Sequence, residues 1–145
     1  METLVEDMKR ALADTFAMYL RTHYYHWNVE GADFFQYHGL FEAIYGEVYG
    51  AIDPMAEEIR ALNAYAPGSF GRYKELATIQ DDDTIPTALE MVAKLQLVNT
   101  MVLASLQTAY RSCGEVEVGL SNFLQDRINA HKKHAWMLRA TLERK

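Results

Sequence analysis

The chain has little cysteine and no excess of positive charge. Cys113 is the one cysteine among 145 residues, so no disulfide can form within a chain, and a reducing compartment such as the cytoplasm is expected. Lysine and arginine number 14 against 20 aspartates and glutamates, which gives a net charge of -6. This balance disfavours an intrinsic affinity for nucleic acid and mildly favours the handling of cations.

The chain also lacks segments that would direct it to a membrane. Met1 is followed by acidic sequence, without a basic and then apolar stretch, so no secretory signal is expected. No apolar run approaches the roughly 20 residues that a bilayer requires. Repeats, low-complexity tracts and interdomain linkers are absent from the sequence as well. Half of the residues are hydrophobic, and we therefore predict one domain over residues 1–145 with a sound core.

Apolar residues recur every three or four positions, which predicts helices over residues 4–27, 34–63, 86–111 and 115–142. A short helical piece is expected within residues 70–79. Asp33 is a candidate cap for the second helix, Thr84 or Asp83 lies near the start of the third, and Gly114 is a plausible stop. Four long helices with a longer link in the middle predict an all-α four-helix bundle, in which that link travels the length of the bundle.

Two imidazoles and two carboxylates form the most informative set of side chains: His26, His38, Asp53 and Glu57. These ligand types suit divalent iron or zinc. Asp53 and Glu57 are four residues apart, so they share a helix face. His38 precedes Asp53 by 15 positions, which is about 22 Å along a helix axis. One straight helix therefore cannot bring His38 and Asp53 to the same ion.

Two copies of the chain resolve this conflict. If two second helices cross antiparallel about a two-fold axis, His38 of one faces Asp53 and Glu57 of the other. The axis would pass near residues 46–48, where Gly46 and the nearby Gly50 allow close approach. His26 could join His38 because a chain reversal separates them. The arrangement predicts two identical sites per dimer, each shared between the two chains.

Each residue also has a simpler interpretation. Asp53 and Pro54 could restart a helix as its cap and first residue. Glu57 alone could be a solvated acid, His38 an ordinary partly buried histidine, and Trp27 a core residue. The usual di-iron pattern of a helical bundle needs Glu-x-x-His pairs, and none of the five histidines has a glutamate three residues before it. A di-iron site of that type within one subunit is therefore not expected.

Four tracts of the sequence form a recognisable pattern. The first tract is His26-Trp27-Asn28-Val29-x-Gly31, followed by Phe34, Phe35, His38, Phe41, Glu42 and Tyr45. The second contains Asp53, Ala56, Glu57, Ile59, Arg60 and Leu62. The third contains Ser69, Phe70 and Tyr73, and the fourth is the ending with His131, Lys133, His134, Trp136, Met137 and Leu138. Together these tracts resemble signatures of the DNA-protection-during-starvation (Dps) family, also called miniferritins, and the resemblance covers residues 4–142.

The resemblance implies a ferritin-like bundle with a short extra helix, twelve copies of which form a hollow shell. It implies di-iron ferroxidase sites across two-fold interfaces, with His26 and His38 from one subunit and Asp53 and Glu57 from its partner. Glu42 matches an acid associated with the second iron or with mineral nucleation, and Trp27 matches an aromatic proposed to quench radicals. The implied activity is oxidation of Fe(II), usually by hydrogen peroxide, and storage of ferric mineral.

The sequence departs from the family pattern in places. The N-terminus has no lysine-rich tail and the C-terminus offers only Arg139, Arg144 and Lys145, so DNA binding is doubtful. Where the family has an acid lining an iron-entry pore, this chain has Asn122, and Glu117 or Asp126 are possible substitutes. Two alternatives stay open at this point. One is a DNA-binding nucleoid protein with secondary iron chemistry, and the other is a zinc-storing or structural shell without redox turnover.

Overall fold

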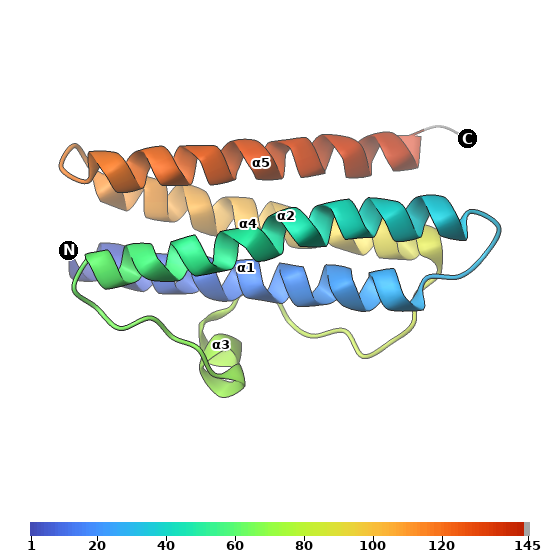
Figure 1. The fold of residues 1–145 in the computed structure, drawn as a ribbon, viewed down its shortest axis with the longest axis horizontal. Helices are drawn as coiled ribbons and strands as arrows, with labels where there is room; N and C mark the ends of the chain where they lie inside the picture. Colours follow the sequence, from blue (N-terminus) through green and yellow to red (C-terminus); the bar gives the residue numbers. More distant parts are fainter. Residues whose placement is uncertain (144–145) are drawn as a thin grey trace.

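The computed structural model describes residues 1–143 as five helices joined by loops, with no strand in that range (Figure 1). The long helices are α1 (Glu2–Asn28), α2 (Phe34–Ala61), α4 (Ala88–Cys113) and α5 (Val118–Glu143), and the short α3 spans Phe70–Leu76. The predicted bundle and its extra helix are confirmed. Arg144 and Lys145, two of the C-terminal bases considered above, lie outside the described residues.

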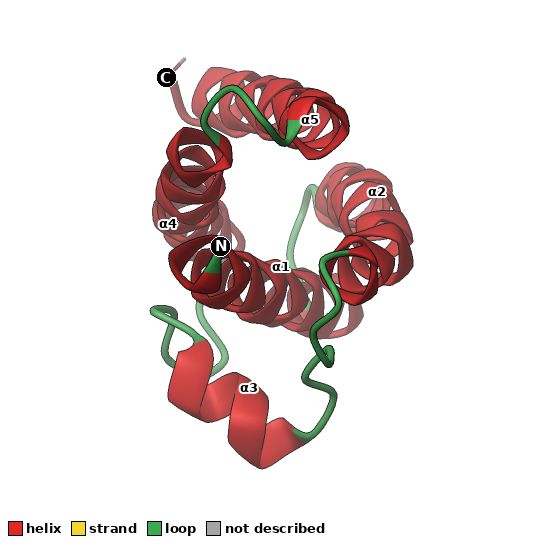
Figure 2. Cartoon of the chain, turned by 90° about the vertical axis from the view of Figure 1, so that its left-hand side faces the viewer, coloured by secondary structure: helices red, strands yellow, loops and turns green. Residues whose placement is uncertain are grey.

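Seen end-on, the four long helices surround a common core while α3 lies outside, against α1 (Figure 2). Around the ring, α1 packs on α2 and on α4, and α4 packs on α5, whereas α2 and α5 contact each other least. Burial of apolar side chains from all four helices is the main favourable contribution to the fold. The largest fully buried side chains are Met8, Leu12, Met18, Tyr25, Phe41, Ile44, Met55, Ile59, Met91, Leu95, Leu106 and Leu124.

The second long helix runs through Pro54 without a break. Pro54 lies inside α2, so the simpler interpretation of Asp53 and Pro54 as a helix restart is wrong. An uninterrupted α2 keeps His38 and Asp53 about 22 Å apart along the axis. The geometric conflict that the sequence posed within one chain is therefore present in the structure.

The start of α4 differs from the expectation. Thr87 caps it in a reciprocal capping box, in which Glu90 N donates to Thr87 Oγ1 (3.3 Å) and Thr87 N donates to Glu90 Oε1 (2.8 Å). Thr84 instead donates its backbone N–H to Asp82 Oδ1 (3.0 Å), which holds it in a turn before the helix. Asp33 is at the N-cap of α2 but makes no side-chain cap, and Gly114 ends α4 with a φ of 59° as predicted.

By length and composition alone, α4 would be able to cross a membrane, although the sequence has no long unbroken apolar run. Its apolar face is in contact with the rest of the bundle. Met91, Val92, Leu95, Val102 and Leu106 are fully buried there. The composition of α4 is thus that of a core helix, which passes the same test.

The long connection between α3 and α4 runs along the bundle and is fastened to α1 (Figure 1). Asp14 of α1 is fully buried and accepts hydrogen bonds from Thr78 N (2.7 Å), Thr78 Oγ1 (2.8 Å) and, from α4, Ser105 Oγ (2.5 Å). The buried carboxyl group of Asp14 therefore joins α1, α4 and the connection. Further along, Tyr25 Oη donates to Asp82 (2.7 Å), and Arg21 donates to the carbonyl of Gln80.

Candidate metal centre

Three potential metal ligands meet where α1 ends and α2 begins. His26 lies in the last turn of α1, and His38 and Glu42 lie one turn apart near the start of α2. One ligand atom from each of the three side chains lies within 4.8 Å of the others. Within residues 1–143 no other set of three histidine, cysteine or acidic side chains comes as close together. The predicted pairing of His26 with His38 across the chain reversal is therefore present in one subunit.

Each imidazole of this cluster is held by the backbone of the other. His26 Nδ1 lies 2.8 Å from the carbonyl oxygen of His38, and His38 Nδ1 lies 2.8 Å from that of His26. A carbonyl oxygen can only accept, so each Nδ1 carries the proton and donates. In the neutral form of each ring, the lone pair is then on Nε2. Such a hydrogen bond from the far nitrogen is how histidine ligands are oriented in metal sites.

The two rings lie against each other at the edge of the core. Their centroids are 3.7 Å apart with an interplanar angle of 16°, and Phe34 stacks on the outer face of His38 at 4.8 Å. His26 is buried, His38 is half-buried and Glu42 is exposed. The ligand atoms thus have one wall of protein and one open side. Such a half-formed site leaves room for ligands from outside the chain.

Asp53 and Glu57 do not join this cluster within one subunit. Both are exposed on α2, one turn apart on a shared face, and α2 carries them away from His38. They are the other half of the predicted ligand set. A single chain thus presents two imidazoles with Glu42 at one place and two carboxylates at another.

An array of aromatic rings adjoins the imidazole pair. Tyr45 is 5.1 Å from the His26 ring and stacks on His23 at 3.9 Å, and Trp27 lies 4.0 Å from His23. Tyr19 Oη is 2.9 Å from His23 Nδ1. Trp27 itself is 61% exposed and reaches the site through His23. The sequence analysis assigned no role to His23 and included Tyr45 only as a member of the first tract. Each nevertheless lies on the same helix face as a predicted ligand, His23 with His26 and Tyr45 with His38.

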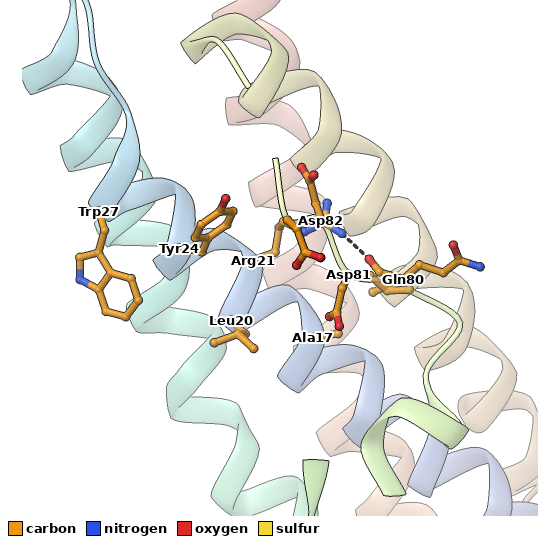
Figure 3. Close-up of a pocket in the computed structure, with 10 residues that line it drawn as sticks. Ala17, Leu20, Arg21, Tyr24, Trp27, Gln80, Asp81 and Asp82 are labelled. Atoms are coloured by element: carbon orange, nitrogen blue, oxygen red, sulfur yellow. Dashed lines mark hydrogen bonds between the residues drawn. The ribbon is translucent and has the colours of Figure 1, made fainter. Parts of the chain in front are cut away.

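An open pocket of about 410 Å³ lies between α1 and residues 79–83 (Figure 3). Leu20, Arg21, Tyr24 and Trp27 line one wall and the three acids of residues 81–83 line the other. None of the three clustered ligands contributes to the lining. Tyr24, which lines the pocket, donates to the carbonyl of Thr84, and the neighbouring Tyr25 donates to Asp82.

The candidate pore residues lie at the start of α5, far along the chain from the imidazoles. Glu117 immediately precedes the helix and is half-buried, while Asn122 and Asp126 are exposed one turn apart on it. Exposure on one helix face is compatible with a channel formed between subunits. The assignment of Glu117 and Asp126 to a pore stays a prediction.

The comparisons with known proteins agree with the fold. Residues 5–145 match the ferritin-like domain. General stress protein 20U of Bacillus subtilis is 31% identical over 142 residues, which is 97% of this chain and 98% of the relative. The DNA protection during starvation protein of Brevibacillus brevis is 32% identical over 139 residues, or 94% of this chain and 92% of the relative.

Two solved structures extend the similarity. Dps from Thermosynechococcus elongatus superposes with a TM-score of 0.95 at 25% identity, covering 99% of this chain and 92% of that one. A Dps protein of Vibrio cholerae O1, a member of a broad superfamily of ferritin-like diiron-carboxylate proteins, gives a TM-score of 0.93 at 30% identity and covers 98% of this chain and 90% of that one. With its bundle, its extra helix and its paired imidazoles, the chain belongs to the ferritin-like proteins, and among them to the Dps miniferritin family.

Proposed function

We propose that this protein is a ferroxidase and iron store that oxidises Fe(II) with hydrogen peroxide at sites shared between two copies of the chain. The single observation that carries the proposal is the imidazole pair, because both Nε2 lone pairs are free and Glu42 lies beside them. Iron is the substrate of this reaction and, as ferric mineral, the stored product. The function would be exercised by a closed shell, with twelve copies as the expected number, in a reducing compartment such as the cytoplasm.

The exposed face of α2 supports a shared site. Asp53 and Glu57 lie on it together with Gly46 and Gly50, and a Cβ built on either glycine would meet nothing within 4 Å. Two such faces can approach closely when they cross antiparallel near residues 46–48. That crossing brings the imidazoles of one copy to the carboxylates of the other, at two equivalent places.

The ligand types suit the chemistry. Imidazoles help to hold Fe(II), while the hard carboxylates of Asp53, Glu57 and Glu42 favour the Fe(III) product. Two Fe(II) ions each give one electron to hydrogen peroxide, whose O–O bond breaks, and with two protons both oxygen atoms become water. Paired one-electron donors thereby avoid the release of hydroxyl radical. The surrounding residues supply position and charge for this reaction.

The direct test is to add Fe(II) and then hydrogen peroxide to the purified protein and to follow ferric absorbance and iron retained after gel filtration. We expect rapid oxidation and co-elution of iron with the shell. Binding of Zn²⁺ without any Fe(II) oxidation would favour the zinc-storing alternative, since zinc accepts the same ligands. Retardation of duplex DNA at physiological salt without Fe(II) oxidation would favour the DNA-binding alternative, which a net charge of -6 does not support.

Trp27→Phe tests whether the aromatic array absorbs stray oxidising equivalents. The indole is an oxidisable ring beside His23, so its loss should raise hydroxyl-radical leakage during peroxide turnover severalfold while the rate of Fe(II) oxidation changes little. Spin trapping measures the leakage. Trp136→Phe removes the other, 55% exposed tryptophan on α5 and serves as the matched control. Unchanged leakage in Trp27→Phe would remove Trp27 from this role.

A further inference from the structure

A second polar cluster lies between α2, α4 and α5, and it reaches the surface at Glu47. It consists of Glu47, Asn99, Arg127, His131 and His134. The last three residues are 7%, 0% and 5% exposed, whereas the Glu47 side chain is 38% exposed. Arg127 donates through both terminal nitrogens to the Glu47 carboxylate, and His134 Nε2 lies 2.8 Å from Glu47 Oε1. Arg127 Nη2 also lies 3.1 Å from His131 Nε2. The guanidinium is thus surrounded by a carboxylate and an imidazole from two helices.

The protonation states follow from the partners. Burial, and the nearby Arg127 charge, lower the pKa of His131 to about 3, so this ring is neutral. Asn99 Nδ2 donates to the His131 carbonyl (2.9 Å), and its Oδ1 faces His131 Nδ1 (2.8 Å), which therefore carries the proton. The Nε2 lone pair is left to accept from Arg127. Although burial would raise it, hydrogen bonds from His134 and Arg127 hold the pKa of Glu47 well below its usual range.

Glu47, His131 and His134 are metal ligands by type. His131 and His134 are three residues apart on α5, and Glu47 faces them from α2. Bundle proteins build metal sites in this way, with inward-pointing ligands on facing helices and pairs at i, i+3. The three ligand atoms here do not converge as closely as those of His26, His38 and Glu42, because the guanidinium lies among them. Arginine keeps its charge at any ordinary pH, so its cation is permanent.

We propose that Glu47, His131 and His134 form a latent divalent-metal site that the Arg127 guanidinium fills, and that Arg127 thereby closes the bundle interior to metal. Within the described residues, Arg127 Nε and His134 Nδ1 are buried without a hydrogen-bond partner. A cluster serving only to hold α2 against α5 would be expected to satisfy these atoms. The guanidinium instead stands where a coordinated cation would, and metal is left to bind at the cluster of His26, His38 and Glu42.

The test uses the intact assembly carrying His26→Ala and His38→Ala, so that the exposed cluster cannot bind metal. In this background, Arg127→Ala should bind about one additional Co(II) per chain, at least about 100-fold more tightly than the parent does. Visible ligand-field absorption of Co(II) reports nitrogen and oxygen coordination. The additional His134→Ala change should abolish this binding. Arg127→Lys, which restores a cation, is the matched control and should bind no additional Co(II).

Three results would overturn the proposal. The first is a folded Arg127→Ala assembly that binds no more Co(II) than Arg127→Lys. The second is Co(II) binding to the parent with Arg127 intact that is lost on His134→Ala, since the guanidinium would then not close the site. The third is an Arg127→Ala chain that folds poorly and whose helical circular dichroism is not restored by refolding with Co(II). Because Fe(II) oxidation plays no part in these measurements, their outcome is separate from that of the proposed function.

Discussion

Replacing both His26 and His38 with alanine is expected to slow peroxide-dependent oxidation of Fe(II) by at least about 100-fold while the shell still assembles. The two rings supply the only imidazole lone pairs of the exposed cluster, and Glu42 alone offers one carboxylate. Loss of the rings also removes the two hydrogen bonds to backbone carbonyls that join the end of α1 to the start of α2. Apolar packing between α1 and α2 also holds these helices together, so assembly should survive. Stopped-flow absorbance measures the rate, and gel filtration measures assembly.

Tyr65→Ala is a suitable control for this experiment, because its ring is 82% exposed on the loop after α2 and lies outside every feature of the site. It should oxidise Fe(II) at the rate of the unmodified protein. Oxidation at a normal rate by an assembled His26→Ala, His38→Ala shell would refute the site assignment. Loss of assembly would instead show that the reciprocal hydrogen bonds are needed for the fold.

Asp14→Ala is expected to destabilise the folded chain by roughly 3 kcal/mol. The change leaves the backbone N–H of Thr78 without its acceptor, together with two hydroxyl groups, those of Thr78 and Ser105. Removing one partner from a buried hydrogen-bond group costs the desolvation of those left behind. The connection to α4 should therefore loosen from α1. Urea unfolding followed by far-ultraviolet circular dichroism measures the effect.

Asp14→Asn is the matched variant, because it keeps the shape of the side chain and an oxygen that can accept from Thr78 N. The hydroxyl groups of Thr78 and Ser105 can rotate to accept from the new amide. We expect Asp14→Asn to lower the free energy of unfolding by less than half as much as Asp14→Ala does. Equal decreases for the two variants would show that packing of the side chain, rather than its hydrogen bonds, fastens the connection.

The sequence was sufficient to predict the four long helices and the placement of His26 beside His38. The periodicity of apolar residues depends on local structure, so it indicates helices directly. The short chain reversal between residues 28 and 34 leaves few ways to place His26 and His38 relative to each other. The start of α4 was misplaced because several residues before it can cap a helix. Which one does so depends on the turn that Asp82 makes with Thr84 and Tyr25, and the partner Tyr25 is 57 residues away.

The interior polar cluster was not predicted, for a similar physical reason. Glu47 and Arg127 are 80 residues apart and look like ordinary surface charges along their own helices. They meet only because α5 returns beside α2, and that register depends on the packing of the whole bundle. The spacing of Arg127, His131 and His134 along one face of α5 was visible in the sequence. It would have identified polar residues on the buried face, but not their partner.

The most direct test of a site shared between chains is to reassemble mixed shells from two inactive parents. One parent carries His26→Ala and His38→Ala, and the other carries Asp53→Ala and Glu57→Ala, so each lacks one half of the ligand set. In a mixed dimer one of the two sites receives both intact halves, so random mixing should restore Fe(II) oxidation to about a quarter of the unmodified rate. Mixed shells that remain as inactive as their parents would contradict a site built from two chains.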